Sequence, residues 1–209
     1  MASRSAAAMP VLLGVAAATV LLAIEALAQV DLRSTFPGRR VGGATRGECS
    51  ARLLAHLVPE SSVYAPGTPV TLALLEGPTA NPYPLLVSLR PQAGGAAVSR
   101  TLPASAAGVT LLKLPPLQAA TVWESSYRCD EGQPVSADPL SFVSASSPPA
   151  LSLLVADRIP ADRTVEASLQ ALRRHCGQSV PKQQLARDFG LDELKTAEWP
   201  DQLPVRCPS

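Results

Sequence analysis

Four cysteines are the first residues of this sequence whose type and spacing could do chemistry. They are Cys49, Cys129, Cys176 and Cys207. In an oxidising compartment an even number of cysteines favours disulfide bonds, and four cysteines allow three pairings among which spacing does not choose. There is no C-x-x-C pair, and helical neighbours such as His175 and Cys176 point about 100° apart, which argues against a shared metal ion. The cysteines therefore predict disulfides and no metal site.

The two histidines, His56 and His175, are the candidate catalytic bases. A serine hydrolase needs a nucleophile elbow such as G-x-S-x-G, or a histidine placed to take a proton from serine, and neither signature surrounds these residues. His56 lies in the apolar stretch 53–58, which favours a partly buried structural role. The sequence predicts no catalytic residue. A hydrolase that uses His56 or His175, with carboxylates brought near by folding, is the first alternative.

One acidic group could bind calcium. Asp130, Glu131 and Asp138 carry oxygen ligands of the kind that calcium prefers. They do not have the order of an EF-hand loop, and acidic residues in a loop are usually solvated. The sequence therefore predicts no calcium site.

Residues 182–194 have the pattern of a helix, a glycine turn and the start of a second helix, as in helix-turn-helix proteins. A DNA-reading helix has to carry donors to phosphates and bases. The expected second helix begins Asp192-Glu193 and offers only Lys195. A helix-turn-helix DNA-binding protein with a spurious export signal is therefore the second alternative, and no nucleic-acid partner is predicted.

Arginine and glycine are concentrated in residues 29–48, which contain few apolar anchors and favour an extended lead-in. Guanidinium groups and the backbone N–H groups of glycine-rich turns suit a carboxylate or a phosphate. The candidate anion-binding residues are Arg39, Arg40 and Arg46. The alternative is a solvated segment without a ligand. The stretch 38–47 lacks the Lys-Ser/Thr ending of a phosphate loop, and no cofactor is predicted.

Met1–Ala28 has the composition of an export signal. Arg4 is followed by an apolar run of 14 residues, Val11–Ile24, and then by the small-x-small cleavage sequence Ala26-Leu27-Ala28. The run is shorter than the ~20 residues that cross a bilayer. We expect cleavage before Gln29, an exported protein in the periplasm or outside the cell, and no transmembrane segment in the mature chain.

The composition excludes global electrostatic attraction to nucleic acid or to an anionic membrane. The chain of 209 residues has 18 Lys and Arg against 17 Asp and Glu, a net charge of +1. Its 21 prolines, about twice the ~5% average usage, indicate many turns and strand edges. The length suits one domain.

Between residues 69 and 142, runs of strand length are divided by proline and glycine. Period-two patterns predict strands over residues 70–74, 85–89, 97–101, 109–114 and 120–129. In the last strand Trp123, Ser125, Tyr127 and Cys129 share one face, with Trp123 and Tyr127 as core supports. Strands at this spacing indicate an antiparallel β-sandwich, with immunoglobulin-like packing as an analogy from Tyr127-x-Cys129.

The C-terminal part has helical spacing. The recurring residues are Val165, Leu169, Leu172 and Cys176. Asp162 and Thr164 are the expected N-caps, and Gly177 is the expected end. A second helix is expected from Pro181 to Phe189, ended by Gly190, and a short third from Asp192 to about Glu198. The fold class is therefore mainly β with α: a sandwich followed by a small helical subdomain.

Several fragments, in order, resemble a known family. They are residues 37–49 (PGRRVGGATRGEC), 57–60 (LVPE), 123–129, 136–139 (SADP) and 190–194 (GLDEL) ahead of Cys207. With these residues the chain is similar to the cyanobacterial exported proteins grouped as domain of unknown function 928. The resemblance implies an envelope location and a β-rich domain with a helical tail, and it implies no activity.

The sequence thus predicts a non-catalytic binding or scaffolding module of the periplasm or cell envelope. Its expected parts are a signal peptide (1–28), the lead-in (29–48), the β-sandwich domain (49–150) and a helical C-terminal subdomain packed on the sandwich (151–209). The expected partner is an envelope protein or an anionic envelope component.

Overall fold

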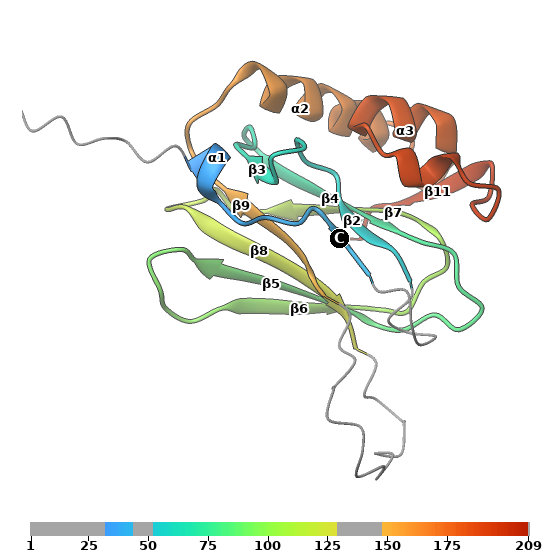
Figure 1. Cartoon of the computed structure of the whole chain (residues 1–209), viewed down its shortest axis with the longest axis horizontal. Coiled ribbons are helices and arrows are strands. Elements are labelled where there is room, and N and C mark those ends of the chain that lie inside the picture. Colours follow the sequence, from blue (N-terminus) through green and yellow to red (C-terminus); the bar gives the residue numbers. More distant parts are fainter. Residues whose placement is uncertain (1–31, 44–51, 129–147, 209) are drawn as a thin grey trace, which may run out of the picture. The chain divides into compact units, whose positions relative to one another are not determined.

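Two mostly apolar segments, residues 70–76 and 108–114, form the centre of a six-stranded sheet (Figure 1). The computed structural model describes residues 32–43, 52–128 and 148–208. The spatial order of this sheet is β1 (Val41–Gly42), β2 (Leu54–His56), β4 (Val70–Glu76), β7 (Gly108–Leu114), β11 (Gln202–Arg206) and β10 (Ser179–Pro181). β11 runs parallel to β7, and the other neighbours are antiparallel.

A five-stranded sheet packs against the first. Its spatial order is β3 (Val63–Tyr64), β9 (Ala150–Leu154), β8 (Thr121–Tyr127), β5 (Leu85–Pro91) and β6 (Val98–Leu102). β3 and β9 are parallel, and the other pairs are antiparallel. The predicted β-sandwich is confirmed, with two parallel pairs that make its sheets mixed.

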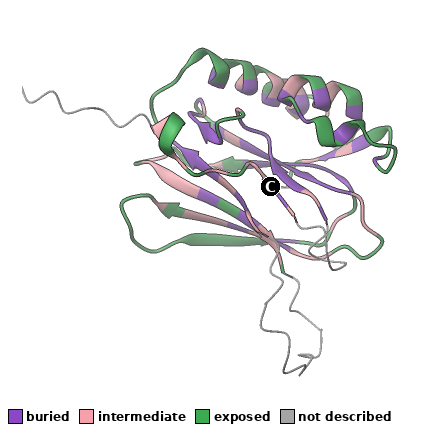
Figure 2. Cartoon of the chain, viewed as in Figure 1, coloured by how far each residue is buried: buried purple, intermediate pink, exposed green. Residues whose placement is uncertain are grey.

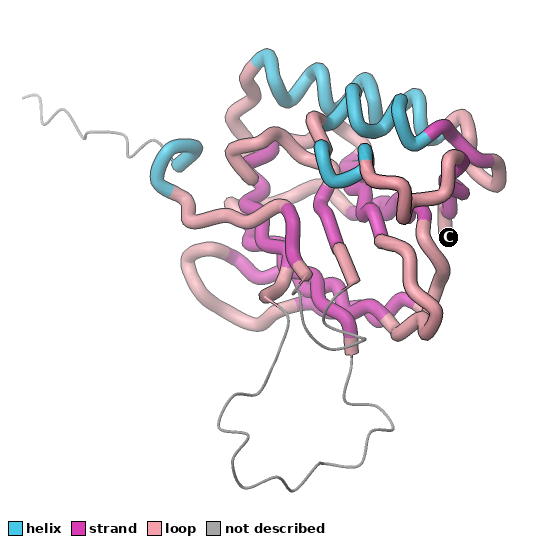
Figure 3. Tube along the Cα trace, turned by 45° about the vertical axis from the view of Figure 1, so that its right-hand side comes forward, coloured by secondary structure: helices cyan, strands magenta, loops and turns pink. Residues whose placement is uncertain are grey.

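Two helices form a third layer, on the face of the six-stranded sheet that the five-stranded sheet leaves free (Figures 1 and 3). They are α2 (Pro160–Arg173) and α3 (Lys182–Phe189). Val165, Leu169 and Leu172 of α2 are buried, as their spacing predicts, in one hydrophobic core with the strands. Because both faces are covered, β4 is buried at six of its seven positions (Figure 2). This double burial explains why its sequence, VTLALLE, is almost continuously apolar.

Asp31–Ser209 forms one compact unit; Met1–Val30, with the predicted signal, lies outside the described residues. The lead-in, expected to be extended, includes the short helix α1 (Leu32–Thr35) as well as β1. The predicted helical C-terminal part holds α2 and α3, but it also contributes β10 and β11 to the six-stranded sheet and almost all of β9 to the other.

Both ends of α2 differ from the prediction. The helix ends at Arg173 with Arg174 as C-cap and does not reach Gly177. α2 begins at Pro160 with Ile159 as N-cap, because proline is pre-organised for the first helical position, so Asp162 stands at the third position. There its Oδ2 accepts the backbone N–H of Ile159 at 2.8 Å. Gly190 ends α3 in the left-handed conformation, as predicted.

The expected third helix is a single 3-10 turn, η1 (Asp192–Lys195). Thr196 after it is extended. The side chain of Lys182 donates to the carbonyls of Thr196 at 3.2 Å and of Trp199 at 2.8 Å. These carbonyls are thereby satisfied without a helix, which is why the segment does not continue as one to Glu198.

Candidate binding pocket

A pocket of about 550 Å³ lies where β4, β7 and β11 meet beside the C-terminal segment. Glu76, the last residue of β4, pairs with Gly108, the first residue of β7. Arg206, the last residue of β11, pairs with Thr110 of β7. The strand register thus brings Glu76, Thr110 and Arg206 together, and they line the pocket with Ser105.

The remaining lining of the pocket is mostly apolar. It consists of Leu102, Pro103, Val205 and Pro208, together with Gly177 and the disulfide between Cys176 and Cys207. A mostly apolar cavity with a few convergent polar groups is the usual form of a small-molecule site, and the volume is within the ~300–1,000 Å³ typical of such sites.

The carboxylate of Glu76, which is 2% exposed, holds the polar groups together. Its Oε2 accepts hydrogen bonds from Ser105 Oγ at 2.7 Å and from Thr110 Oγ1 at 3.4 Å. The same atom accepts a bond from Arg206 Nη2 at 3.0 Å. Its Oε1 lies 3.4 Å from Nη1 of Arg52. Oε2 of Glu76 therefore has three donors, whereas the buried Oε1 faces Arg52 as an ion pair without a hydrogen bond.

Arg52 lies behind this group and is 2% exposed. Its Nε donates to the carbonyl of Gly77 at 2.8 Å and its Nη2 to that of Ser105 at 2.7 Å. The ring of Tyr127 covers the guanidinium, with 4.7 Å from Cζ to the ring centroid. Burial raises the pKa of Tyr127 above its ordinary value, so this ring stays neutral and adds no negative charge.

Arg206 is partly exposed, with 29% of its side chain accessible to solvent. Its Nε donates to Thr110 Oγ1 at 3.2 Å and its Nη2 to Glu76. Two guanidinium groups, of Arg52 and Arg206, thus share one carboxylate, which leaves one positive charge. The sequence analysis did not identify Arg52, Glu76 or Arg206 as site residues. The only signal was a charged residue at the end of an otherwise apolar strand run, as in VTLALLE.

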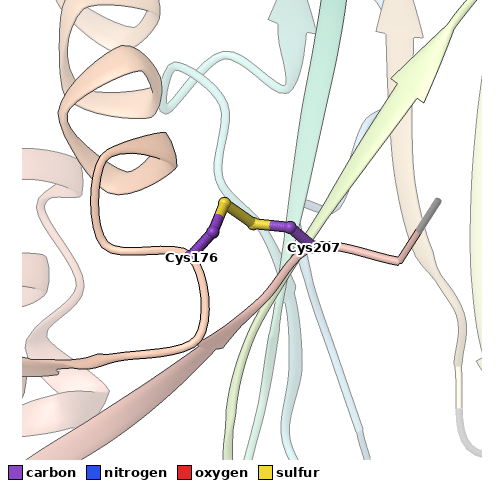
Figure 4. Close-up of a disulfide and its surroundings, with 2 residues drawn as sticks. All are labelled: Cys176 and Cys207. Carbon is purple, nitrogen blue, oxygen red and sulfur yellow. A yellow bond between two sulfur atoms is a disulfide. The ribbon is translucent and has the colours of Figure 1, made fainter.

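One disulfide borders the pocket and joins Cys176, just after α2, to Cys207, just after β11 (Figure 4). Their Cα atoms are 5.7 Å apart, and the bond closes a separation of 31 residues. The prediction of disulfide bonds is confirmed for Cys176 and Cys207. The structure selects this pair from the pairings that the sequence left open. Cys49 and Cys129 lie outside the described residues.

If the chain is fully oxidised, the observed bridge leaves Cys49 to pair with Cys129. Trypsin cleaves after Arg and Lys and puts the four cysteines in four peptides, 47–52, 129–158, 175–182 and 207–209. We expect a non-reduced digest to contain 175–182 linked to 207–209, and 47–52 linked to 129–158. Mass spectrometry before and after reduction measures this directly. A link between 47–52 and 175–182 would contradict the pairing.

The predicted anion-binding arginines are not brought together as one described group. Arg39 is exposed and its backbone forms a bridge with Leu151. The guanidinium of Arg40 donates to three carbonyls, those of Val58 at 3.2 Å, Phe189 at 2.7 Å and Gly190 at 2.8 Å. Arg46 lies outside the described residues. Arg40 therefore has a structural role at the C-terminal end of α3, where a cation is favourable; anion binding by the three arginines stays a prediction.

Arg40→Ala should lower the free energy of unfolding by about 1–2 kcal/mol, because hydrogen bonds from a charged group to three carbonyls are lost at a partly exposed site. Urea denaturation followed by tryptophan fluorescence measures the change. Arg39→Ala, which removes the same charge from an exposed neighbour, is the matched control and should stay within about 0.5 kcal/mol of the wild type. Equal effects of the two substitutions would contradict the structural role.

His56 is fully buried in the sandwich core. Its Nδ1 lies 2.8 Å from Ser152 Oγ and its Nε2 lies 3.0 Å from Ser125 Oγ, so both ring nitrogens have partners. Its ring stacks on Trp123, with centroids 3.5 Å apart. His56 is 0% exposed, so no substrate reaches it in the folded chain. The predicted structural role of His56 fits this geometry, which offers the hydrolase alternative no accessible base there.

Burial lowers the pKa of His56 well below 6.5. The unfolded chain takes up a proton near pH 6.5 whereas the folded chain does not, so stability is lost as the pH falls below that value. We expect the free energy of unfolding to drop by about 1.4 kcal/mol more in the wild type than in His56→Gln between about pH 7.5 and 5.5. Urea titrations at each pH measure this. His175→Gln, which changes the half-buried histidine near Gln178, should keep the wild-type slope; loss of the slope there would contradict the assignment to His56.

The other sequence candidates fall outside the pocket. Asp130, Glu131 and Asp138 lie outside the described residues, within which no group of His, Cys, Asp and Glu is placed to hold a metal ion. The segment 182–194 consists of α3, a glycine turn and η1, and one 3-10 turn is too short to lie along a DNA groove. None of the helices formed by residues 32–43, 52–128 and 148–208 has the length and apolar character that a membrane span requires.

The fold and the pocket define a mixed β-sandwich with a helical layer and a disulfide-bordered cavity, lined by Glu76 and Arg206 with the buried Arg52 behind them. No family model, curated protein or solved structure matches this chain. The resemblance to domain of unknown function 928 therefore stays a prediction, and the argument for function rests on the pocket.

Proposed function

We propose that the mature chain is an exported, non-catalytic binding module of the periplasm or cell envelope, and that the pocket at Arg206 is its ligand site. The carrying observation is the guanidinium of Arg206, which Glu76 and Thr110 hold in a mostly apolar cavity. A group held in place before binding loses little freedom when a ligand arrives, which favours affinity. Placement on strand ends makes the site rigid.

The exported location is supported by the composition of Met1–Ala28 and by a chain whose cysteines are even in number. The test is the intact mass of the protein recovered from its host, with thiol labelling before and after reduction. We expect a chain that begins at Gln29 and four thiols that react only after reduction. A full-length chain with free thiols would contradict export.

Binding is tested with an envelope extract of the host. The purified protein is equilibrated with the extract and washed, and the retained compounds are then released by denaturation and identified by mass spectrometry. We expect a compound that is enriched on the wild type and lost from Arg206→Leu. Arg163→Leu, which removes an exposed arginine of α2 outside the pocket, should retain it. Equal retention by the wild type and Arg206→Leu, or none by either, would contradict a ligand site at Arg206.

A further inference from the structure

The geometry points to a small amphipathic carboxylate as the ligand of this pocket: a molecule whose carboxylate binds Nη1 of Arg206 and whose apolar body lies against Leu102, Pro103, Val205 and Pro208. This inference rests on the proposed function and names the chemical class that the site selects. It follows from the charge balance, from the one side chain that keeps donors, and from the apolar lining.

The charge balance favours an anion over a cation. Glu76 Oε2 already accepts from Ser105, Thr110 and Arg206, and Oε1 faces Arg52. A cationic ligand could be accepted only by Oε1, which is buried without a hydrogen-bond partner and faces the Arg52 guanidinium at 3.4 Å, and it would add positive charge next to two guanidinium groups. An anion instead offsets the single positive charge that Arg52 and Arg206 leave over Glu76.

One side chain keeps donors for the ligand. The hydroxyl protons of Ser105 and Thr110 point to Glu76, and Arg206 uses two of its five N–H groups, one on Nε and one on Nη2. Among the described side chains that line the pocket, only Arg206 keeps N–H groups without a partner: the two on Nη1 and the second one on Nη2. Nη1 lies against Gly108, where a Cβ atom would come within 2.7 Å of it. Glycine at this position leaves the guanidinium room beside β7.

The apolar lining selects the rest of the ligand. Leu102, Pro103, Val205 and Pro208 present hydrocarbon surface next to the guanidinium, and the disulfide holds the segment that carries Pro208. Burial of an alkyl chain contributes about 0.8 kcal/mol for each CH₂ group, so a short charged anion such as acetate loses most of the available affinity. A carboxylate with an apolar chain or ring uses both parts of the site.

The probes are octanoate and three relatives that each remove one feature: octan-1-ol lacks the charge, octylammonium reverses it, and acetate lacks the chain. Binding is followed by calorimetry and by the amide signals of Ser105 and Thr110 in ¹⁵N-labelled protein, which locate the probe without a mutation. We expect octanoate to bind at least tenfold more tightly than each relative, with shifts at both amides.

Arg206→Gln should reduce octanoate affinity at least tenfold, to the level of octan-1-ol, whereas Arg163→Gln, at an exposed arginine of α2 outside the pocket, should leave it unchanged. Thermal melts show whether Arg206→Gln folds, and the comparison of probes on the wild type stands even where it does not. An acetylated tripeptide that ends in leucine, as free acid and as amide, distinguishes the two sources of such a carboxylate. Tighter binding of the free-acid peptide than of octanoate assigns the ligand to a peptide C-terminus, and weaker binding assigns it to a free acid.

Two negative results have different meanings. If octan-1-ol or octylammonium binds as tightly as octanoate, with shifts at Ser105 and Thr110, the carboxylate class is wrong while a ligand site at the pocket stands. If no probe shifts these amides but the envelope extract yields a compound that depends on Arg206, the carboxylate class is again wrong. If the extract also yields nothing, the proposed function fails with it.

Discussion

Replacing Glu76 with alanine should lower the free energy of unfolding by about 3–5 kcal/mol. The side chain of Arg52 is 1% exposed and faces Glu76 at 3.4 Å, so the substitution leaves a buried guanidinium without a counter-charge. Arg206 and Ser105 lose their acceptor as well. Urea denaturation followed by fluorescence measures the loss, since Trp123 and Trp199 are both buried in the folded chain.

Two further variants separate charge from shape. Glu76→Gln keeps the size of the side chain and should still cost more than about 1 kcal/mol, because the neutral amide does not balance Arg52. The double variant Arg52→Met, Glu76→Leu removes both charges and should recover much of the stability lost in Glu76→Ala, since a buried ion pair often adds little over apolar packing. A loss below about 1 kcal/mol in Glu76→Ala would contradict the role of Glu76 as the counter-charge of Arg52.

Replacing Asp162 with alanine should lower the free energy of unfolding by about 3–4 kcal/mol. Asp162 is 0% exposed and accepts from both Nη atoms of Arg33, at 3.2 and 2.7 Å. It also accepts the backbone N–H groups of Ala65 at 3.1 Å and Ile159 at 2.8 Å. Its loss leaves the N–H of Ala65 buried without this acceptor. The upper end of this range is lower than that for Glu76→Ala. The reason is that Arg33, the cation that loses its partner, is 16% exposed and partly solvated.

The matched control for this substitution is Asp157→Ala. Asp157 is exposed, and Arg33 Nη2 donates to its backbone carbonyl at 2.7 Å, a contact that alanine retains. This variant should stay within about 0.5 kcal/mol of the wild type in the same urea titration. A cost for Asp162→Ala no larger than that of its control would contradict the view that Asp162 anchors α1 and the start of α2 to the sandwich.

Local patterns in the sequence predicted the longer elements. The alternation over 70–74, 85–89 and 109–114 lies within β4, β5 and β7. Helical spacing predicted α2 and α3, and glycine chemistry predicted the end of α3 at Gly190. These features depend on neighbours within a few residues, so they can be predicted from the sequence alone. The spacing was less informative at 192–198, where only residues 192–195 form a 3-10 turn and Lys182 binds the carbonyls of Thr196 and Trp199 that follow it.

The short strands and the cysteine pairing could not be predicted from the sequence, because they depend on contacts between distant parts of the folded chain. β11 is five residues long, contains Pro204 and lies parallel to β7, about a hundred residues earlier in the chain. Nothing near β11 in the sequence indicates that partner. In the same way spacing allowed three cysteine pairings, and only the approach of the end of α2 to the end of β11 selects Cys176 with Cys207.

By itself the sequence determined a mainly-β chain with a helical C-terminal part and the elements that carry each charge. Tertiary structure decided which charges meet. Glu76 and Arg206 are 130 residues apart, and each ends a separate strand. β4 and β11 lie on opposite edges of β7. The two residues become partners because the register pairs Glu76 with Gly108 and Arg206 with Thr110, which are two residues apart on β7 and therefore share one face of the sheet. Register and strand order are set by contacts summed over the whole sheet, and no local pattern records them.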